Sequence, residues 1–295
     1  MDSEIKKLIN QFKKEGFTKS NKILDKNECA KLYKKVKKNR NWDKNLFMLE
    51  KNFLKNPQLT KTNPGKGIQN LSEEFDLDFL EKNKKINNFL NLVLGDNWEI
   101  MLSKFVVAVP QQWMPDYVKK IHTKSLISNF NPYIKKKFRD VTYFHGIDYH
   151  MDSRDNKGGT NKFITMYIYL NDTNINMSPL NVIKKSHLNG HTTFPHWIKD
   201  EKNKDYLFYK ENKNKFYKKF FKETLIGRTG SVYFWTSNTL HGTMPSHTTH
   251  NKFRISLRYL IKSNDKNKMI IDNIIKGNKI KKVNETRKKS KRTLI

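Results

Sequence analysis

The stretch Tyr149-His150-Met151-Asp152 sets an imidazole and a carboxylate two residues apart. Successive side chains of an extended chain point to opposite faces, so His150 and Asp152 point the same way. Further along, the run from Ser231 to Trp235 has the β-branched and aromatic composition of a strand, and His241 follows it. This pattern predicts a β structure that brings His150, Asp152 and His241 together from distant parts of the chain.

These three residues have the composition of a metal centre. Two imidazoles and one carboxylate on one face of an octahedron leave three positions open, which is the arrangement that non-haem Fe(II) oxygenases use. The open positions suit a chelating cosubstrate and O2. A His-x-Asp triplet alone is common, and its histidine is more often a surface or hydrogen-bonded residue. The prediction that His150, Asp152 and His241 bind a metal therefore depends on further residues of matching chemistry.

A candidate anion receptor follows the second histidine. In the strand-like run from Lys252 to Leu260, Arg254, Ser256 and Arg258 share one face, while apolar residues occupy the other. A guanidinium and a hydroxyl side by side make a carboxylate receptor. We expect Arg254 to be part of the catalytic site; the alternative is that it is a solvated strand residue.

At this point the sequence resembles the phytanoyl-CoA dioxygenase-like branch of the Fe(II)/2-oxoglutarate-dependent oxygenases. The segment Ser178-Pro179-Leu180-Asn181-Val182 through Ser186-His187-Leu188-Asn189-Gly190 is similar to the family's G-P-L-x-V-x-P-G-S-H-x-x-G pattern. Thr229-Gly230-Ser231 through His241-Gly242-Thr243-Met244-Pro245 to Arg254 resembles its G-D … H-G-S-x-P … R pattern, and Glu15-Gly16-Phe17 resembles its opening. The resemblance covers residues 15 to 262. Lys184-Lys185, Ser178 and Ser231 depart from the pattern without removing a ligand residue.

The resemblance implies a function and a set of binding residues. It implies hydroxylation of a small-molecule substrate, with Fe(II) as metal, 2-oxoglutarate and O2 as cosubstrates, and succinate and CO2 as products. The distal carboxylate of 2-oxoglutarate would pair with Arg254, with help from Thr243 or Ser256. Lys104 is a further expected contact, because a lysine of the equivalent strand has this role in some members; a solvated strand lysine is the alternative. Alternation in the run from Phe163 to Leu170 adds Thr165, although it does not show which face looks inward.

The expected fold is mainly β with helical additions (α+β): a double-stranded β-helix, that is a jelly-roll or cupin-like barrel, with an N-terminal helical layer. We expect residues 1–95 to form a helical region on the barrel, 96–262 the catalytic core and 263–295 a basic, flexible tail. Helices are predicted from residue 4 to 15 and from Asp25 to about residue 38. Strands are predicted at 98–109 and 163–170. Residues 200–222 are predicted as exposed helix or loop, and 225–235 with 244–261 as the last strand pair.

Composition limits the class of protein. The net charge is +31, but 51 of the 59 basic residues are Lys and only 8 are Arg, whereas readers of base edges and phosphates depend on Arg. Nucleic acid is therefore a disfavoured partner, while an anionic substrate or an acidic partner fits the charge. The single Cys29 and the absence of an apolar leader or of a long apolar run predict a cytoplasmic protein without membrane insertion.

Three rival functions remain open on the sequence. A nucleic-acid dealkylase of the same mechanistic class would use the basic surface, but Arg254 and Arg258 do not match the R-x-N-x-x-x-x-x-R spacing of that family. A cupin-like binding protein without catalysis would not need Arg254. A basic nucleic-acid-binding protein with incidental histidines would bind in a strongly salt-dependent manner and consume no oxygen.

Overall fold

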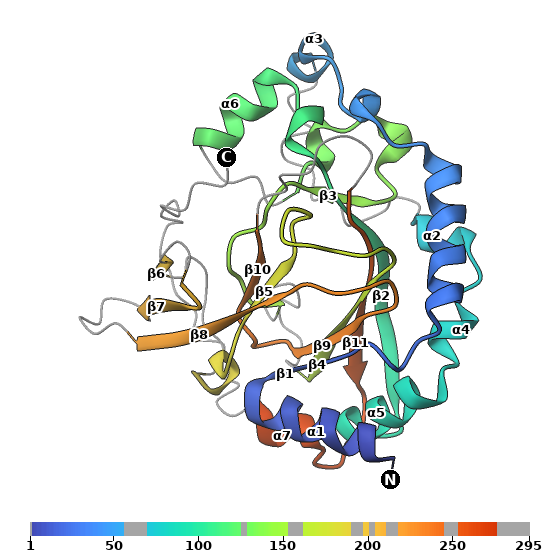
Figure 1. The fold of residues 1–295 in the computed structure, drawn as a ribbon, viewed down its shortest axis with the longest axis vertical. Coiled ribbons are helices and arrows are strands. Elements are labelled where there is room, and N and C mark those ends of the chain that lie inside the picture. The colour runs from blue at the N-terminus through green and yellow to red at the C-terminus, as the bar shows by residue number, and fades with distance from the viewer. Residues whose placement is uncertain are drawn as a thin grey trace.

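The computed structural model describes residues 2–55, 70–124, 129–152, 162–189, 197–200, 204–210, 218–244 and 253–275. Two sheets form its centre (Figure 1). The six-stranded sheet has the order β1-β9-β4-β11-β2-β3 and the five-stranded sheet the order β10-β5-β8-β7-β6. The strands are β1 Phe17–Ser20, β2 Trp98–Ala108, β3 Thr142–Phe144, β4 Phe163–Tyr169, β5 Leu180–Ile183, β6 Trp197–Asp200, β7 Tyr206–Lys210, β8 Lys218–Leu225, β9 Val232–Thr236, β10 His241–Thr243 and β11 Ile255–Ser263.

Helices surround one side of the six-stranded sheet (Figure 1). They are α1 Ser3–Glu15, α2 Lys26–Arg40, α3 Glu50–Leu54, α4 Asp78–Glu81, α5 Lys84–Leu94, α6 Asp116–Lys124 and α7 Ile270–Ile274, with short 3-10 turns between them. Local sequence explains their ends. The side chain of Asp25 accepts a hydrogen bond from the Asn27 backbone at the start of α2, and α1 ends at Gly16, whose φ of 80° suits a residue without a side chain. None of these helices is long and apolar enough to cross a membrane.

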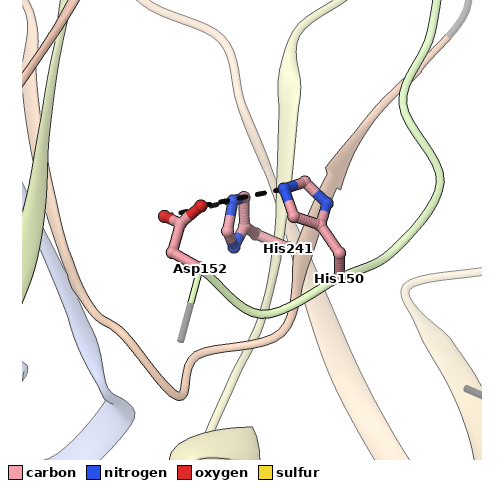
Figure 2. Close-up of side chains that lie close together, drawn as sticks. All are labelled: His150, Asp152 and His241. Atoms are coloured by element: carbon pink, nitrogen blue, oxygen red, sulfur yellow. Dashed lines mark ion pairs between the residues drawn. The ribbon is translucent and has the colours of Figure 1, made fainter. Parts of the chain in front are cut away.

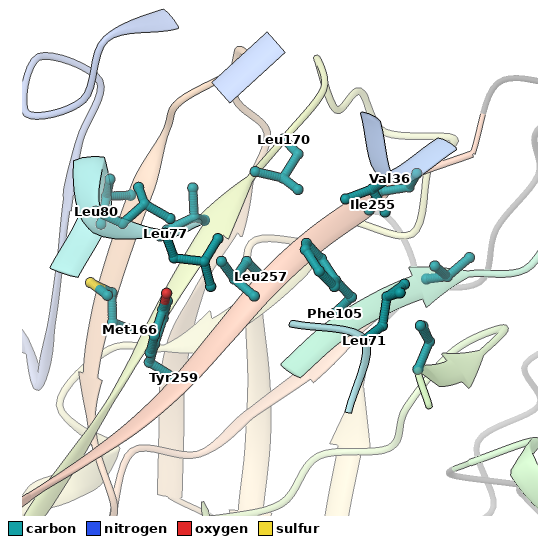
Figure 3. Close-up of a cluster of buried hydrophobic side chains, with 14 of the residues drawn as sticks. Val36, Leu71, Leu77, Leu80, Phe105, Met166, Leu170, Ile255, Leu257 and Tyr259 are labelled. Carbon is teal, nitrogen blue, oxygen red and sulfur yellow. The ribbon is translucent and has the colours of Figure 1, made fainter. Parts of the chain in front are cut away.

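The largest hydrophobic core lies between the helices and the six-stranded sheet (Figure 3). The central strand β11 contributes Ile255, Leu257 and Tyr259 to it, and β2 contributes Phe105. Val36 of α2 packs into the same cluster from the helical layer. Since side chains alternate along a strand, Arg254, Ser256 and Arg258 lie on the opposite face, toward the inside of the barrel.

These observations confirm the predicted fold class and its N-terminal helical layer. The predicted strand at 163–170 is β4, which lies between β9 and β11 in the centre of the six-stranded sheet. The start of the flexible tail, by contrast, was predicted too early in the chain, at residue 263. Ile271 and Ile274 of α7 are buried in the main core, so the packed chain extends to residue 275. Residues 276–295 lie outside the described part.

Two predictions about strands are wrong. Within the helix or loop predicted at 200–222, residues 206–210 and 218–222 instead form the paired strands β7 and β8, while residues 201–203 and 211–217 lie outside the described residues. The apolar residues Leu207 and Phe220 of these strands form one buried cluster with Tyr149 and Met151. The sequence did not indicate this burial, because lysines surround the apolar residues in this part of the chain. Among the described residues, the predicted pair of strands at 225–235 and 244–261 does not form either. β9 pairs with β1 and β4, while β11 pairs with β2 and β4, because jelly-roll connections separate strands that are neighbours in sequence.

Leu257→Ala tests the main core. Leu257 is fully buried, so we expect its truncation to lower the free energy of unfolding by about 2–5 kcal/mol through lost burial and a cavity. Urea denaturation measures this change. Leu54→Ala is the matched control, because Leu54 is 67% exposed and should change stability by less than about 0.5 kcal/mol. Equal effects of the two substitutions would contradict the described core.

Candidate metal centre

A short backbone ladder joins the two predicted histidine ligands. His150 and His241 form an antiparallel bridge, with hydrogen bonds from each backbone N–H to the other residue's carbonyl oxygen at 2.8 and 3.0 Å. His241 begins β10, which pairs with β5. Gly242 allows the close approach, since a side chain there would meet the Ile147 carbonyl oxygen at 2.8 Å. The ladder places the two imidazoles beside each other, with ring centroids 4.3 Å apart (Figure 2).

Backbone carbonyls determine which nitrogen each imidazole presents. His150 Nδ1 lies 2.9 Å from the Asp148 carbonyl oxygen, and His241 Nδ1 lies 3.0 Å from the Thr239 carbonyl oxygen. A carbonyl only accepts hydrogen bonds, so both Nδ1 atoms carry the proton and both Nε2 atoms present a lone pair. Burial, the largest effect, lowers the pKa of His241 to about 4 despite the nearby Asp152. The neutral form that a metal requires is therefore the stable one at neutral pH.

Asp152 completes the cluster from a fully buried position. Its carboxylate oxygens lie 3.8 Å from His150 Nε2 and 3.6 Å from His241 Nε2, and all three ligand atoms lie within 4.8 Å of one another. Figure 2 shows the three side chains converging. Two imidazole nitrogens and one carboxylate are the donor set of a non-haem Fe(II) site. The residues thus fit a divalent transition metal.

Three side chains of the six-stranded sheet hold the Asp152 carboxylate. Arg258 Nη2 donates to Oδ1 at 2.6 Å, while Thr165 Oγ1 and Trp235 Nε1 donate to Oδ2 at 2.6 and 2.9 Å. Burial by itself would raise the pKa of Asp152. The charge of Arg258 and the hydrogen bond from Thr165 oppose the effect of burial, so the pKa of Asp152 lies well below its ordinary value and the carboxylate is ionised.

Arg254 places a buried positive charge inside the barrel. Its side chain is fully buried, and its Cζ lies 5.1 to 5.4 Å from the ring centroids of Phe144, Tyr167 and Tyr169. Within the described residues none of its three guanidinium nitrogens has a hydrogen-bond partner, and neither has the buried hydroxyl of Ser256. A buried charge without a partner is costly. This position therefore fits a ligand that brings a carboxylate.

The remaining predicted residues lie on the inner side of the barrel in different situations. Lys104 faces Arg258 across the β2–β11 pair, and burial followed by the charge of Arg258 lowers its pKa. Thr243 Oγ1 accepts a hydrogen bond of 2.7 Å from the Ile147 backbone. Thr165 directs its hydroxyl proton to Asp152, as described above. A direct contact of these residues with a cosubstrate stays a prediction.

No role for Trp235 and no ion pair between Asp152 and Arg258 were predicted from the sequence. The signal for Trp235 was weak, because it shares an alternation phase with Tyr233 in the run from Val232 to Trp235, whose residues are all apolar or aromatic. Arg258 was recognised as lying on the Arg254 face, but spacing along one strand does not reveal which acid on another segment it meets.

Comparisons with known proteins agree with this architecture. The model of a family described as phytanoyl-CoA dioxygenase matches residues 12–255. The epimerase SnoN, solved in complex with Fe3+, alpha ketoglutarate and nogalamycin RO, is 11% identical, covers 89% of this chain and 85% of its own, and has a TM-score of 0.54. A second SnoN structure is 10% identical over 89% and 84% of the two chains, with a TM-score of 0.52. At such identities these structures show a shared fold. None of the curated protein sequences compared matches the chain.

The metal ligands can be tested by substitution. Wild-type protein should bind one Fe(II) per chain, and His150→Ala or His241→Ala should lose most of it, because two remaining ligands do not hold the octahedral face. Anaerobic equilibrium dialysis with metal analysis measures the stoichiometry. His145→Gln is the control, since His145 is a buried histidine near the same segment whose Nδ1 lies 3.1 Å from the Val109 carbonyl oxygen. Unchanged iron in both alanine variants would refute the assignment.

Proposed function

Because the chain belongs to the phytanoyl-CoA dioxygenase family of Fe(II)- and 2-oxoglutarate-dependent oxygenases, we propose that it hydroxylates a small-molecule substrate and releases succinate and CO2. One observation carries the proposal: the His150, Asp152 and His241 cluster shares the barrel interior with the buried, unpartnered guanidinium of Arg254. Such a combination suits a cosubstrate that offers a metal chelate at one end and a carboxylate at the other. A barrel used only for binding would not need a buried, unpaired guanidinium, which is energetically unfavourable.

The metal and 2-oxoglutarate, when bound, supply the oxidation of a substrate C–H bond by O2. The protein residues then have positioning roles. His150, Asp152 and His241 hold the metal through one face. Arg254 binds the distal carboxylate of 2-oxoglutarate in a forked pair, and the Ser256 hydroxyl donates a further hydrogen bond to it. Lys104 of β2 and Thr243 of β10, which belong to different sheets, are additional proposed contacts.

The surroundings of Arg254 strengthen its proposed pairing. Phe144, Tyr167 and Tyr169 are buried rings that enclose the guanidinium. The Tyr169 hydroxyl donates to the Leu225 carbonyl oxygen at 2.8 Å and accepts from the Leu180 backbone N–H at 3.2 Å. The rings exclude water, so a charged hydrogen bond there is stronger than at the surface. The cosubstrate would thus be fixed before the substrate enters.

Arg254→Lys separates cosubstrate binding from metal binding. Lysine keeps the charge but loses the planar fork. We expect the variant to bind Fe(II) normally while its affinity for 2-oxoglutarate falls by about 1.5–3 kcal/mol, on the order of ten- to a hundredfold. Titration of 2-oxoglutarate into the anaerobic Fe(II) protein, followed by the metal-to-ligand charge-transfer band, measures this. The same change at the exposed Arg228 is the control, and equal affinities for Arg254→Lys and wild type would move the carboxylate anchor away from Arg254.

The reaction itself is tested with metabolite extracts. The Fe(II) protein, mixed anaerobically with 2-oxoglutarate and extract and then exposed to air, should consume 2-oxoglutarate and add one oxygen to the mass of a substrate. Asp152 occupies the coordination position that chloride needs in halogenating relatives, so chloride should not enter the product. A chlorinated product, or 2-oxoglutarate loss without any oxygenated product, would argue against a hydroxylase.

A further inference from the structure

The Asp152 carboxylate has almost no free acceptor sites. An ionised carboxylate has two oxygens with about two lone-pair positions each. Oδ2 accepts hydrogen bonds from Thr165 Oγ1 at 2.6 Å and from Trp235 Nε1 at 2.9 Å, which fills both of its positions. Oδ1 accepts one, from Arg258 Nη2 at 2.6 Å. A single lone pair on Oδ1 is therefore left for a metal.

The three donors come from adjacent strands. Thr165 lies on β4, Trp235 on β9 and Arg258 on β11, and these strands are neighbours in the sheet. Thr165 and Trp235 are direct cross-strand partners. Their common target is the only carboxylate of the described metal cluster, and it is fully buried, so no water competes with the donors. The ladder of the sheet thus fixes the orientation of the carboxylate.

On the basis of the proposed function, we propose that Thr165, Trp235 and Arg258 are positioning residues that restrict Asp152 to binding the metal through one oxygen. A carboxylate that chelates through both oxygens takes one more coordination position. The proposed chelation by 2-oxoglutarate needs two positions and O2 needs the third. The donors to Oδ2 therefore protect a position that the cosubstrates require.

This role differs from simple neutralisation of a buried charge. Neutralisation would need only Arg258, whose charge already opposes that of Asp152. Thr165 and Trp235 are uncharged, and both donate to the same oxygen, away from the one that Arg258 holds. Their loss should free Oδ2 for the metal. The expected consequence is retained metal with altered coordination, whereas loss of a merely supporting contact would weaken metal binding or folding.

The experiment compares Thr165→Val with Thr165→Ser. Valine keeps the volume but removes the donor, and serine keeps the donor. We expect Thr165→Val to bind one Co(II) or Fe(II) per chain and to show a changed Co(II) d–d absorption spectrum without cosubstrate. Its 2-oxoglutarate affinity should fall by about ten- to a hundredfold, because the second oxygen of Asp152 would compete for a position that the cosubstrate needs. Thr165→Ser should behave as wild type. Thr18→Val, a buried threonine on the same sheet that donates to Gln11, is the control for the substitution itself.

Trp235→Phe is the second variant and removes the other donor to Oδ2. It should change the Co(II) spectrum and the 2-oxoglutarate affinity in the same direction, which keeps the proposal testable if Thr165→Val does not fold. A wild-type Co(II) spectrum and wild-type 2-oxoglutarate affinity in a folded variant would overturn the proposal, as would loss of the metal itself. A wild-type protein that binds neither metal nor 2-oxoglutarate would instead refute the proposed function.

Discussion

The burial of one negative charge is the constraint on which the centre of this protein depends. Asp152 is shielded completely from solvent, so its charge must be compensated by the protein, because an isolated carboxylate in an apolar interior is strongly unfavourable. Arg258 supplies the opposite charge, and Thr165 and Trp235 supply neutral donors. These residues lie on three adjacent strands. The pairing of those strands is thus coupled to the ionisation of the Asp152 carboxyl group.

The two faces of strand β11 have different roles: one packs in the hydrophobic core and the other carries the arginines of the barrel interior. Ile255, Leu257 and Tyr259 pack under the helices, while Arg254 and Arg258 point into the barrel. The strand has two paired neighbours, β2 and β4, over most of its length. The helical layer therefore stabilises the position of the two guanidinium groups, although none of the α-helices of the described residues supplies a ligand atom to the metal cluster.

Local patterns in the sequence predicted what depends on local physics. Alternation placed His150 with Asp152 and Arg254 with Arg258, and Asp25 and Gly16 marked helix ends. The sequence did not reveal which strands pair, because strands that follow each other in the chain are separated by jelly-roll connections. It also did not predict β7 and β8, because the burial of Leu207 and Phe220 depends on Tyr149 and Met151, which are distant in the sequence. The bond between Arg258 and Asp152 joins positions 106 residues apart and has no local signature.

The backbone bridge between His150 and His241 lets the surroundings of the metal centre change in evolution while the two histidines stay in place. The two histidines are held by their own main-chain hydrogen bonds, so connecting segments that carry neither a metal ligand nor a donor to Asp152 can change in length and composition without displacing either imidazole. Selection on mutations in these segments would then act on substrate binding and not on metal binding. Such a division lets one scaffold acquire new substrates through gradual drift, with each intermediate still able to hold its metal.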